Sequence, residues 1–262
     1  MFGAILSPSN RAGGLIRSIL ISISALLLAA CQDTATPAPT RLPPPSPVAF
    51  VPIGDLIESG AAPPPGVVTT AGYLVVDSAG ATLVDGLSFA ADGTPQLIEN
   101  DMDQIWLGAD AGATLKDRLR SASGLQFAAA QARGQLEGPG SYGPGGRYHY
   151  QIVSPSIELI AARDITIGEL LQQPSSYEGQ LVRLVGSLLT RDASALLVEQ
   201  LGAGGLPTPK ARQIKLRAPL RDRLLLSHLK GVSGGTIRFG QVQIEGFWHA
   251  GVLIPLSIIL VT

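Results

Sequence analysis

Cys31 is the only cysteine in this chain of 262 residues, and its surroundings indicate what its thiol does. A single cysteine cannot form an intrachain disulfide, so the folded part of the chain must be held together by its core. The residues before it run from Arg11 and Arg17 through an apolar segment at residues 19–28 to two alanines. A basic start, a short apolar stretch and small residues at a cleavage point are typical of an export signal. The apolar segment is also shorter than the roughly 20 residues that a membrane-spanning helix requires.

The segment Leu28-Ala29-Ala30-Cys31 resembles the lipobox of bacterial lipoproteins, and the resemblance covers residues 1–31. It implies that a diacylglycerol is attached to the Cys31 thiol and that cleavage falls between Ala30 and Cys31. Residues 1–30 would then be a signal peptide. Two acyl chains, at about 0.8 kcal/mol per buried methylene, anchor a protein stably where one chain is marginal. The resemblance therefore implies a lipid-anchored protein on the extracytoplasmic face of a membrane.

A proline-rich segment follows the predicted anchor. Residues 34–47 contain six prolines, which remove backbone donors and favour extended conformations. We expect residues 31–47 to be a disordered, semi-rigid stalk that spans at most about 3.1 Å per residue. The alternative is a proline-rich ligand for a partner domain. The remainder is rich in glycine and short apolar runs, which predicts a globular, mainly β structure.

The region after the stalk contains an internal repeat, and five short segments recur in the same order. They are Ile53-Gly54-Asp55-Leu56 with Ile167-Gly168-Glu169-Leu170, Gly72-Tyr73-Leu74 with Gly186-Ser187-Leu188, Gln104-Ile105-Trp106-Leu107 with Gln213-Ile214-Lys215-Leu216, Leu115-Lys116-Asp117-Arg118-Leu119 with Leu220-Arg221-Asp222-Arg223-Leu224, and Gln131-Ala132-Arg133-Gly134 with Gln243-Ile244-Glu245-Gly246. Conserved order at nearly constant spacing indicates a duplication. We therefore predict two domains: residues 48–163, the first half, and residues 164–262, the second half.

The second half shows the clearer pattern. Alternation predicts strands at residues 181–192, 195–199, 213–217, 236–247 and 251–261. A helix is expected between the third and fourth strands, with Pro219 in its first turn and Gly231 at its end. Gly240 is the expected site of a β-bulge, and Pro255 should lie at an edge or a bulge.

This order of elements resembles the OB-fold, a five-stranded Greek-key barrel. The first half fits less well, because residues 125–145 form a longer stretch that is rich in glycine and alanine. The predicted fold is mainly β: two tandem five-stranded OB-like barrels, each with one helix, after the signal peptide and the stalk. The resemblance is to an architecture that hosts many functions, so it implies no chemistry.

Two glycine-rich segments match site signatures but lack the required context. Residues 231–235 read Gly-Val-Ser-Gly-Gly, yet a hydrolase nucleophile elbow needs a strand before its serine and a helix after it. The predicted order here is the reverse, which favours a flexible turn. Residues 138–143 match the dinucleotide fingerprint, but a strand at residues 147–152 follows where a helix is required. A hairpin loop is the better interpretation.

The acidic and histidine residues do not form a recognisable metal site. Four acidic residues cluster in the first half, but they lack the glycine and closing glutamate of a calcium loop; they are Glu99, Asp101, Asp103 and Asp110. Adventitious calcium binding is the alternative to a solvated loop. The three histidines, His149, His228 and His249, are isolated from one another. We predict no metal and no cofactor.

Charge is divided unevenly between the halves. Residues 31–163 carry 7 basic and 13 acidic side chains, a net charge of −6, whereas residues 164–262 carry 10 and 7, a net charge of +3. Six bases fall within residues 210–223: Lys210, Arg212, Lys215, Arg217, Arg221 and Arg223. Lys215 and Arg217 would lie outward on the third strand, where nucleic-acid-binding OB-folds hold their ligand. The predicted export argues against nucleic acid as the partner of these bases. An anionic lipid headgroup, an envelope polymer or protein, or the acidic first half are the remaining partners, and a solvated face is the alternative.

Two aromatic residues are expected to point outward from the first barrel. Alternation places Tyr73 and Trp106 outward, at positions that match Ser187 and Lys215 of the second half. Outward aromatics on a small barrel mark a covered surface. We predict that both are buried between the domains, with a ligand platform as the alternative. The candidate binding or interface residues are Tyr73, Trp106, Arg183, Lys215, Arg217 and Trp248.

These observations predict a lipid-anchored protein with a non-catalytic binding or scaffolding role at the cell envelope. Its partners would be the membrane, through the lipid on Cys31, and an envelope component. The alternative function is a hydrolase of envelope polymers. No nucleophile, base and orienting group occur together in a credible context, so we predict that the protein is not an enzyme.

Overall fold

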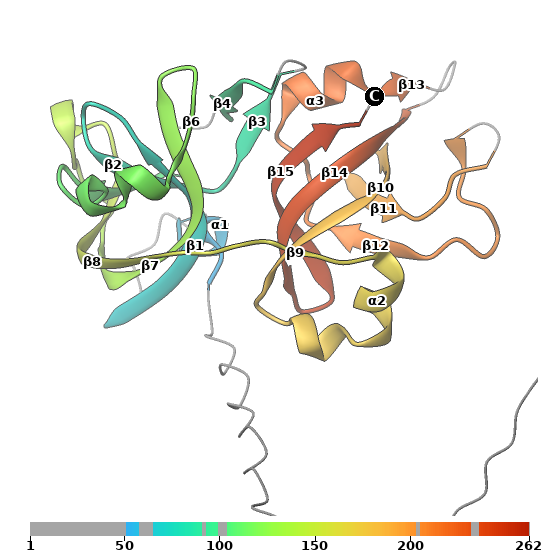
Figure 1. The fold of residues 1–262 in the computed structure, drawn as a ribbon, viewed down its shortest axis with the longest axis horizontal. Helices are drawn as coiled ribbons and strands as arrows, with labels where there is room; N and C mark the ends of the chain where they lie inside the picture. Colours follow the sequence, from blue (N-terminus) through green and yellow to red (C-terminus); the bar gives the residue numbers. More distant parts are fainter. Residues whose placement is uncertain are drawn as a thin grey trace, which may run out of the picture. The chain divides into compact units, whose positions relative to one another are not determined.

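The computed structural model describes residues 51–57, 65–90, 93–98, 104–202, 205–231 and 236–261 (Figure 1). The predicted signal peptide, the lipidation and cleavage positions Ala30 and Cys31, and the stalk lie outside these residues. The fold is mainly β, with one closed five-stranded mixed barrel and a second, ring-like sheet. All described residues belong to one compact unit.

Five strands of the first half form what we call the first ring. In ring order they are β1 (Val67–Val76), β2 (Ala81–Val84), β5 (Gln104–Gly108), β8 (Tyr150–Leu159) and β7 (Leu125–Glu137). The ring closes because β7 pairs with β1, and only β5 and β8 are parallel. A short strand, β6 (Arg120–Ala122), extends it beside β7. Alternate side chains point inward and build an apolar core that includes Leu74, Leu83, Ile105 and Ile152.

Five strands of the second half form the second ring, which belongs to a nine-stranded sheet. In ring order they are β10 (Leu181–Arg191), β11 (Ser194–Val198), β12 (Gln213–Leu216), β15 (Val252–Leu260) and β14 (Ile237–His249). Here β14 pairs with both β10 and β15, and only β12 and β15 are parallel within the ring. The side branches are β9 (Arg163–Asp164), β13 (Lys230–Gly231), β3 (Leu87–Phe89) and β4 (Pro95–Leu97). All five strands that the sequence predicts for the second half are confirmed.

The two rings pair their strands in the same register. Gly72 lies opposite Ala130 in the first ring, as Gly186 lies opposite Val242 in the second. The parallel closure also matches, because Trp106 pairs with Gln151 and Lys215 pairs with Val252. Four of the five recurring sequence segments therefore occupy equivalent places in the two rings.

The two rings share a β-bulge at the same place, which corrects a prediction. In the first ring the register between β7 and β8 shifts around Gly134. In the second ring the register between β14 and β15 shifts between Glu245 and Gly246. A Cβ atom on Gly246 would lie 2.5 Å from the carbonyl oxygen of Ile254, so the close backbone approach requires glycine. Gly240, where we expected the bulge, stays in register opposite Leu188. Pro255 lies at the bulge, as expected.

A helix precedes the first strand of each ring. In the second half, α2 (Ile167–Gln172) begins with a capping box in which Thr166 and Glu169 each accept a backbone N–H from the other. Its counterpart in the first half is α1 (Ile53–Ile57). Short 3₁₀ helices lie at Ala113–Arg118, Pro144–Gly146 and Pro174–Tyr177. None of the helices among the described residues is long and apolar enough to span a membrane.

The helix between the third and fourth ring strands begins later than predicted. It is α3 (Arg223–His228), and Asp222 caps it by accepting the backbone N–H of Leu225 at 2.8 Å. Pro219 therefore precedes the helix, and Leu229 ends it. Leu229 corresponds to Leu119, because each ends a helix and precedes a short strand. These short strands pair in the same way, β13 with β14 and β6 with β7. The fourth recurring segment of the list was thus matched out of register: Leu119 does not correspond to Leu224.

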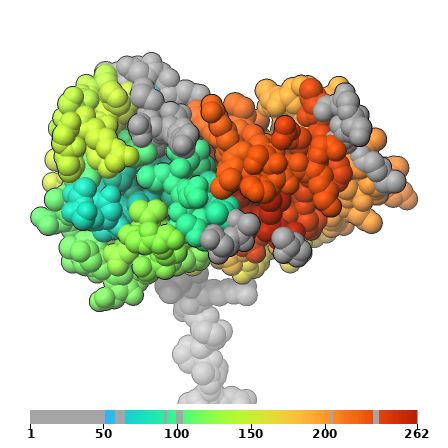
Figure 2. Space-filling view, turned by 90° about the horizontal axis from the view of Figure 1, so that it is seen from above, coloured from blue at the N-terminus to red at the C-terminus, as the bar shows by residue number. Residues whose placement is uncertain are grey.

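A hairpin from the first half completes the sheet of the second half. Strands β3 and β4 pair with each other, and Leu87 of β3 pairs in parallel with Ser257 of β15. In Figure 2 the cyan and green atoms of the first half lie directly against the red and orange atoms of the second. An apolar cluster fills this contact and combines Ala71, Tyr73, Val75, Val84, Leu87, Phe127 and Ala129 with Leu181, Phe247, Ile254 and Leu256.

Candidate functional site

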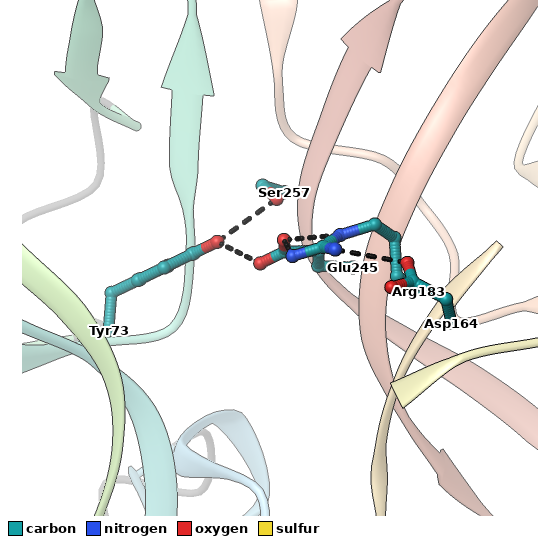
Figure 3. A network of polar contacts seen from close by, with 5 residues as sticks. All are labelled: Tyr73, Asp164, Arg183, Glu245 and Ser257. Carbon is teal, nitrogen blue, oxygen red and sulfur yellow. Dashed lines mark hydrogen bonds and ion pairs between the residues drawn. The ribbon is translucent and has the colours of Figure 1, made fainter. Parts of the chain in front are cut away.

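A buried polar network lies at the junction of the two halves (Figure 3). The phenol of Tyr73 on β1 donates a hydrogen bond to Oε2 of Glu245 at 2.9 Å and contacts Oγ of Ser257 at 3.1 Å. Tyr73 is only 2% exposed, and Glu245 and Ser257 are buried as well. Because the acceptors lie on β14 and β15, these bonds join the first ring directly to the second.

The carboxylate of Glu245 is held from its other side by Arg183. Nε and Nη2 of Arg183 both donate to Oε1 of Glu245, at 2.9 and 2.7 Å. Nη1 of Arg183 donates to Oδ1 of Asp164 at 3.0 Å, and the Asp164 side chain is exposed. Two charge-assisted hydrogen bonds from one guanidinium hold the Glu245 carboxylate in position and balance its charge. The network therefore runs from a buried phenol to the protein surface.

The electrostatics of the network keep Tyr73 protonated. Burial raises the pKa of Tyr73 above its usual range, and the negative charge of Glu245 raises it further. The hydrogen bond to Glu245 likewise raises the pKa of Arg183. Tyr73 is therefore a neutral hydrogen-bond donor to Glu245. The hydrogen bonds of the network therefore form a fixed joint between the two halves.

A cavity of about 130 Å³ opens beside this joint. Its apolar wall includes Leu87, Leu97, Ile98, Ile254 and Leu256, and Ser257 of the network also lines it. Its charged residues are Asp85 from the first half with Arg217, Arg221 and Asp222 from the second. An apolar hollow with a few convergent polar groups is the usual form of a small-ligand site.

Arg217 connects the cavity to the first half. Its guanidinium forms an ion pair with the carboxylate of Asp55 on α1. The side chains of both residues are roughly a third or more exposed, so solvent weakens this pair. Arg217, which we expected on the third strand, follows the end of β12 and lines the cavity.

The structure separates the two aromatic residues that were expected to share the interface. Tyr73 crosses to the second half, as described above, but Trp106 does not. The indole of Trp106 stacks on Tyr148 with ring centroids 5.1 Å apart, and both residues belong to the first half. Trp106 is 8% exposed and points outward from the ring, but the loop before β8 covers it. The prediction that Trp106 lies between the halves is wrong.

Two other candidates lie away from the junction. Trp248 is buried in the interior core of the second ring, so it cannot form a binding surface. Lys215 is exposed on the outer side of β12, as the alternation predicts. The basic residues of the segment 210–223 have different surroundings: Arg217 and Arg221 line the cavity, Arg223 is the first residue of α3, and Arg212 faces Glu199 at 3.9 Å.

The sequence motifs give no further site among the described residues. Residues 138–143 lie in the loop between the antiparallel strands β7 and β8, which confirms the predicted hairpin loop. Four residues of the Gly-x-Ser-x-Gly segment, 232–235, lie outside the described residues, as do Glu99, Asp101 and Asp103. Within the described part, no group of three or more His, Cys, Asp or Glu side chains could hold a metal ion.

Sequence reasoning missed Glu245, Ser257, Asp164 and Asp55, which complete the junction. The sequence contained a signal for Glu245, because the equivalent position in the first copy of the repeat has the opposite charge, Arg133. The register of β10 and β14, which places Arg183 opposite Glu245, cannot be read from either strand alone.

Comparisons with known proteins add no assignment: no protein family, no curated protein and no solved structure matches this chain.

Proposed function

We propose that this chain is an exported lipoprotein, anchored through a lipid on Cys31, that presents two OB-like barrels as one rigid binding module at the cell envelope. The shared ring order supports the OB-like interpretation. In each ring the strands follow the order first, second, third, fifth and fourth, with a helix between the third and fourth. The lipobox-like segment before Cys31 supports the anchor.

The observation that carries the proposed role is the junction itself. The buried Tyr73–Glu245 bond and the paired β3 strand make one body of the two halves, and the cavity lies between residues of both. A module of this kind binds without catalysis, because its charged groups are engaged in structural contacts: Asp222 caps α3 and Arg217 pairs with Asp55. The ligand would be a small envelope component that has both apolar and charged groups.

The anchor is tested with Cys31→Ser in the full-length chain. Serine offers no thiolate to accept the lipid, so lipid labelling should be abolished and the protein should remain an uncleaved precursor or enter the soluble fraction. Cys31→Ala serves as a second variant of different size. A variant that matures at the same position and stays in the membrane without acyl label would contradict the anchor.

The binding role is tested by filling the cavity. Ile98→Trp in the detergent-solubilised lipoprotein should remove envelope lipids or polymer fragments that co-purify with the parent protein. Leu171→Trp, at an exposed position on α2 away from the cavity, is the matched control. Equal amounts of bound material in all three proteins would contradict the cavity as the binding site.

A further inference from the structure

The contact between the two halves buries one outer face of the first ring and a different outer face of the second ring. Because the two rings are copies of each other, each ring has both of these faces. We call the outer residues that the first ring buries in this contact the plug, chiefly Ala71, Tyr73, Val75, Phe127 and Ala129. We call the residues of the second ring that receive them the socket: Leu181, Phe247, Ile254 and Leu256. Because the rings share their register, the second ring has positions equivalent to the plug, and the first ring has positions equivalent to the socket.

The equivalent positions follow directly from the strand pairs. Val75 with Phe127 and Tyr73 with Ala129 correspond to Leu189 with Phe239 and Ser187 with Gln241. We call these residues of the second ring, together with Val185, the open plug; Val185 and Gln241 are exposed, Leu189 and Phe239 are half-buried, and Ser187 is buried. On the other side, Leu181 and Ile254, which flank Phe247, correspond to Val67 and Val153, which flank Gln135. Val67, Gln135 and Val153 of the first ring are the open socket.

Both open faces carry apolar side chains that solvent reaches. Val67 is 64% exposed and Val153 39% in the open socket, and Val185 is 54% exposed in the open plug. Val261 is 45% exposed beside Gln241, and its counterpart Ile160 packs against the buried contact. These four are among the seven large hydrophobic side chains that are exposed in the described part of the chain. Exposed apolar residues gathered in this way mark an interaction surface.

We infer that the open plug of one chain docks on the open socket of a second copy, head to tail. This inference rests on the proposed anchored, non-catalytic role and names the chain itself as a partner. Charge favours the arrangement, because it brings the second half, at +3, against the first half of the neighbour, at −6. A like-with-like contact would instead place charges of one sign together.

The polar centre of the internal contact has a reversed counterpart in the open faces. Glu245, the acceptor in the socket, corresponds to Arg133, which is exposed on the open socket. Tyr73, the donor in the plug, corresponds to Ser187, whose hydroxyl donates to Gln241 at 3.0 Å. Arg133 would donate to the oxygens of Ser187 and Gln241 in the neighbouring chain. Donor and acceptor change sides, and the contact stays complementary.

In an open assembly this arrangement leaves one open plug and one open socket free at the two ends. A heterologous contact of this type closes into a ring or continues as a filament. The contact is weaker than the internal one, since Ser187 and Val153 bury less apolar area than Tyr73 and Ile254. Lipid anchoring confines the chains to a surface and raises their effective concentration, which favours association of weak contacts.

Cysteine cross-linking of the full-length lipidated protein in vesicles of phosphatidylethanolamine and phosphatidylglycerol tests this arrangement. With Cys31 occupied by lipid, introduced cysteines are the free thiols. Val153→Cys with Val185→Cys in one chain, treated with a short bismaleimide, should give a ladder of dimers, trimers and larger products. A mixture of the two single variants should give dimers only. Val153→Cys with Leu171→Cys is the matched control and should give no ladder.

A further variant separates the contact from chance collisions. Val67→Glu, added to the double-cysteine chain, should reduce the cross-linked fraction at least tenfold, while Leu171→Glu should leave it unchanged. Circular dichroism and the melting temperature verify that each variant is folded. Monomers alone, or dimers formed by Val185→Cys with itself, would overturn the head-to-tail contact. Fractionation of the same sample reports anchoring separately, so a failed anchor and a failed contact give different results.

Discussion

The two rings have nearly the same interior and very different exteriors. Inward positions stay apolar in both: Leu74 corresponds to Leu188 and Ile105 to Ile214, and all four are buried. Even the large difference between Leu136 and Trp248 keeps an apolar side chain inside. A closed ring of strands has no other place for its core, so the interior tolerates changes of size but not of polarity.

The outward positions decide what each ring does. Trp106 corresponds to Lys215, Tyr73 to Ser187 and Arg133 to Glu245. Trp106 is buried where Lys215 is exposed, and Glu245 is buried where Arg133 is exposed. Tyr73 and Ser187 are both buried, but only Tyr73 bonds to the other half. One fold therefore provides two modules whose contacts are set by a few outward side chains.

The largest difference is expected between Trp106→Ala and Lys215→Ala. Trp106 is buried and stacked on Tyr148, so truncation should lower the free energy of unfolding by about 3–5 kcal/mol. Lys215 occupies the equivalent place but is exposed, and its truncation should change stability by less than about 0.5 kcal/mol. Urea unfolding of the detergent-solubilised full-length chain measures both. Equal effects would show that the equivalent positions do not differ in burial.

The second comparison is Glu245→Ala against Arg133→Ala. Removing Glu245 leaves Arg183 without its buried partner and Tyr73 without its acceptor, which should cost about 3 kcal/mol. Arg133 is exposed, so its removal should cost less than about 0.5 kcal/mol in the monomer. The same unfolding experiment, with Glu245→Ala and Arg183→Met combined, separates the charge effect. If the double variant is no more stable than Glu245→Ala alone, the loss of Arg183's buried partner is not the cause of the lower stability.

Much of this fold could be predicted from local sequence patterns. The alternation of Val182, Leu184 and Leu188 defines the inward face of β10, and the repeated segments locate the same strand in the first half. Periodicity carries this information because a strand with one buried face must alternate. The bulge was misplaced at Gly240 because alternation alone does not reveal close backbone contact, which Gly246 makes with Ile254 across the strand pair.

The site could be predicted only in part. An outward tyrosine indicated a covered surface, and Tyr73 is covered. The same reasoning failed for Trp106, since the loop that covers it comes from residues near Tyr148, far along the chain. Nor could it find Glu245 or the β3 strand's crossing to β15, because both depend on pairing between distant segments. Periodicity identifies which side of a strand a residue occupies, but not what packs against that side.

The smallest effect, and the one that depends on pH, is expected for Tyr73→Phe against Ser187→Ala. Near pH 7 the loss of the Tyr73 hydroxyl should cost about 1–2 kcal/mol, because it leaves the Glu245 carboxylate short of a donor. Ser187→Ala should cost about 0.5–1 kcal/mol. Tyrosine ionises near pH 10 when unfolded, and its pKa is raised in the folded chain, so the folded state holds the proton more tightly. The contribution of Tyr73 is therefore complete below about pH 10 and is lost as pH rises further, since the unfolded state releases the proton first. The difference in unfolding free energy between the parent and Tyr73→Phe should narrow between about pH 9 and pH 11, whereas Tyr142→Phe, at a partly exposed tyrosine, shows how much of any change is general. A gap that stays constant or widens over that range would contradict a buried, protonated Tyr73 at the joint between the two rings.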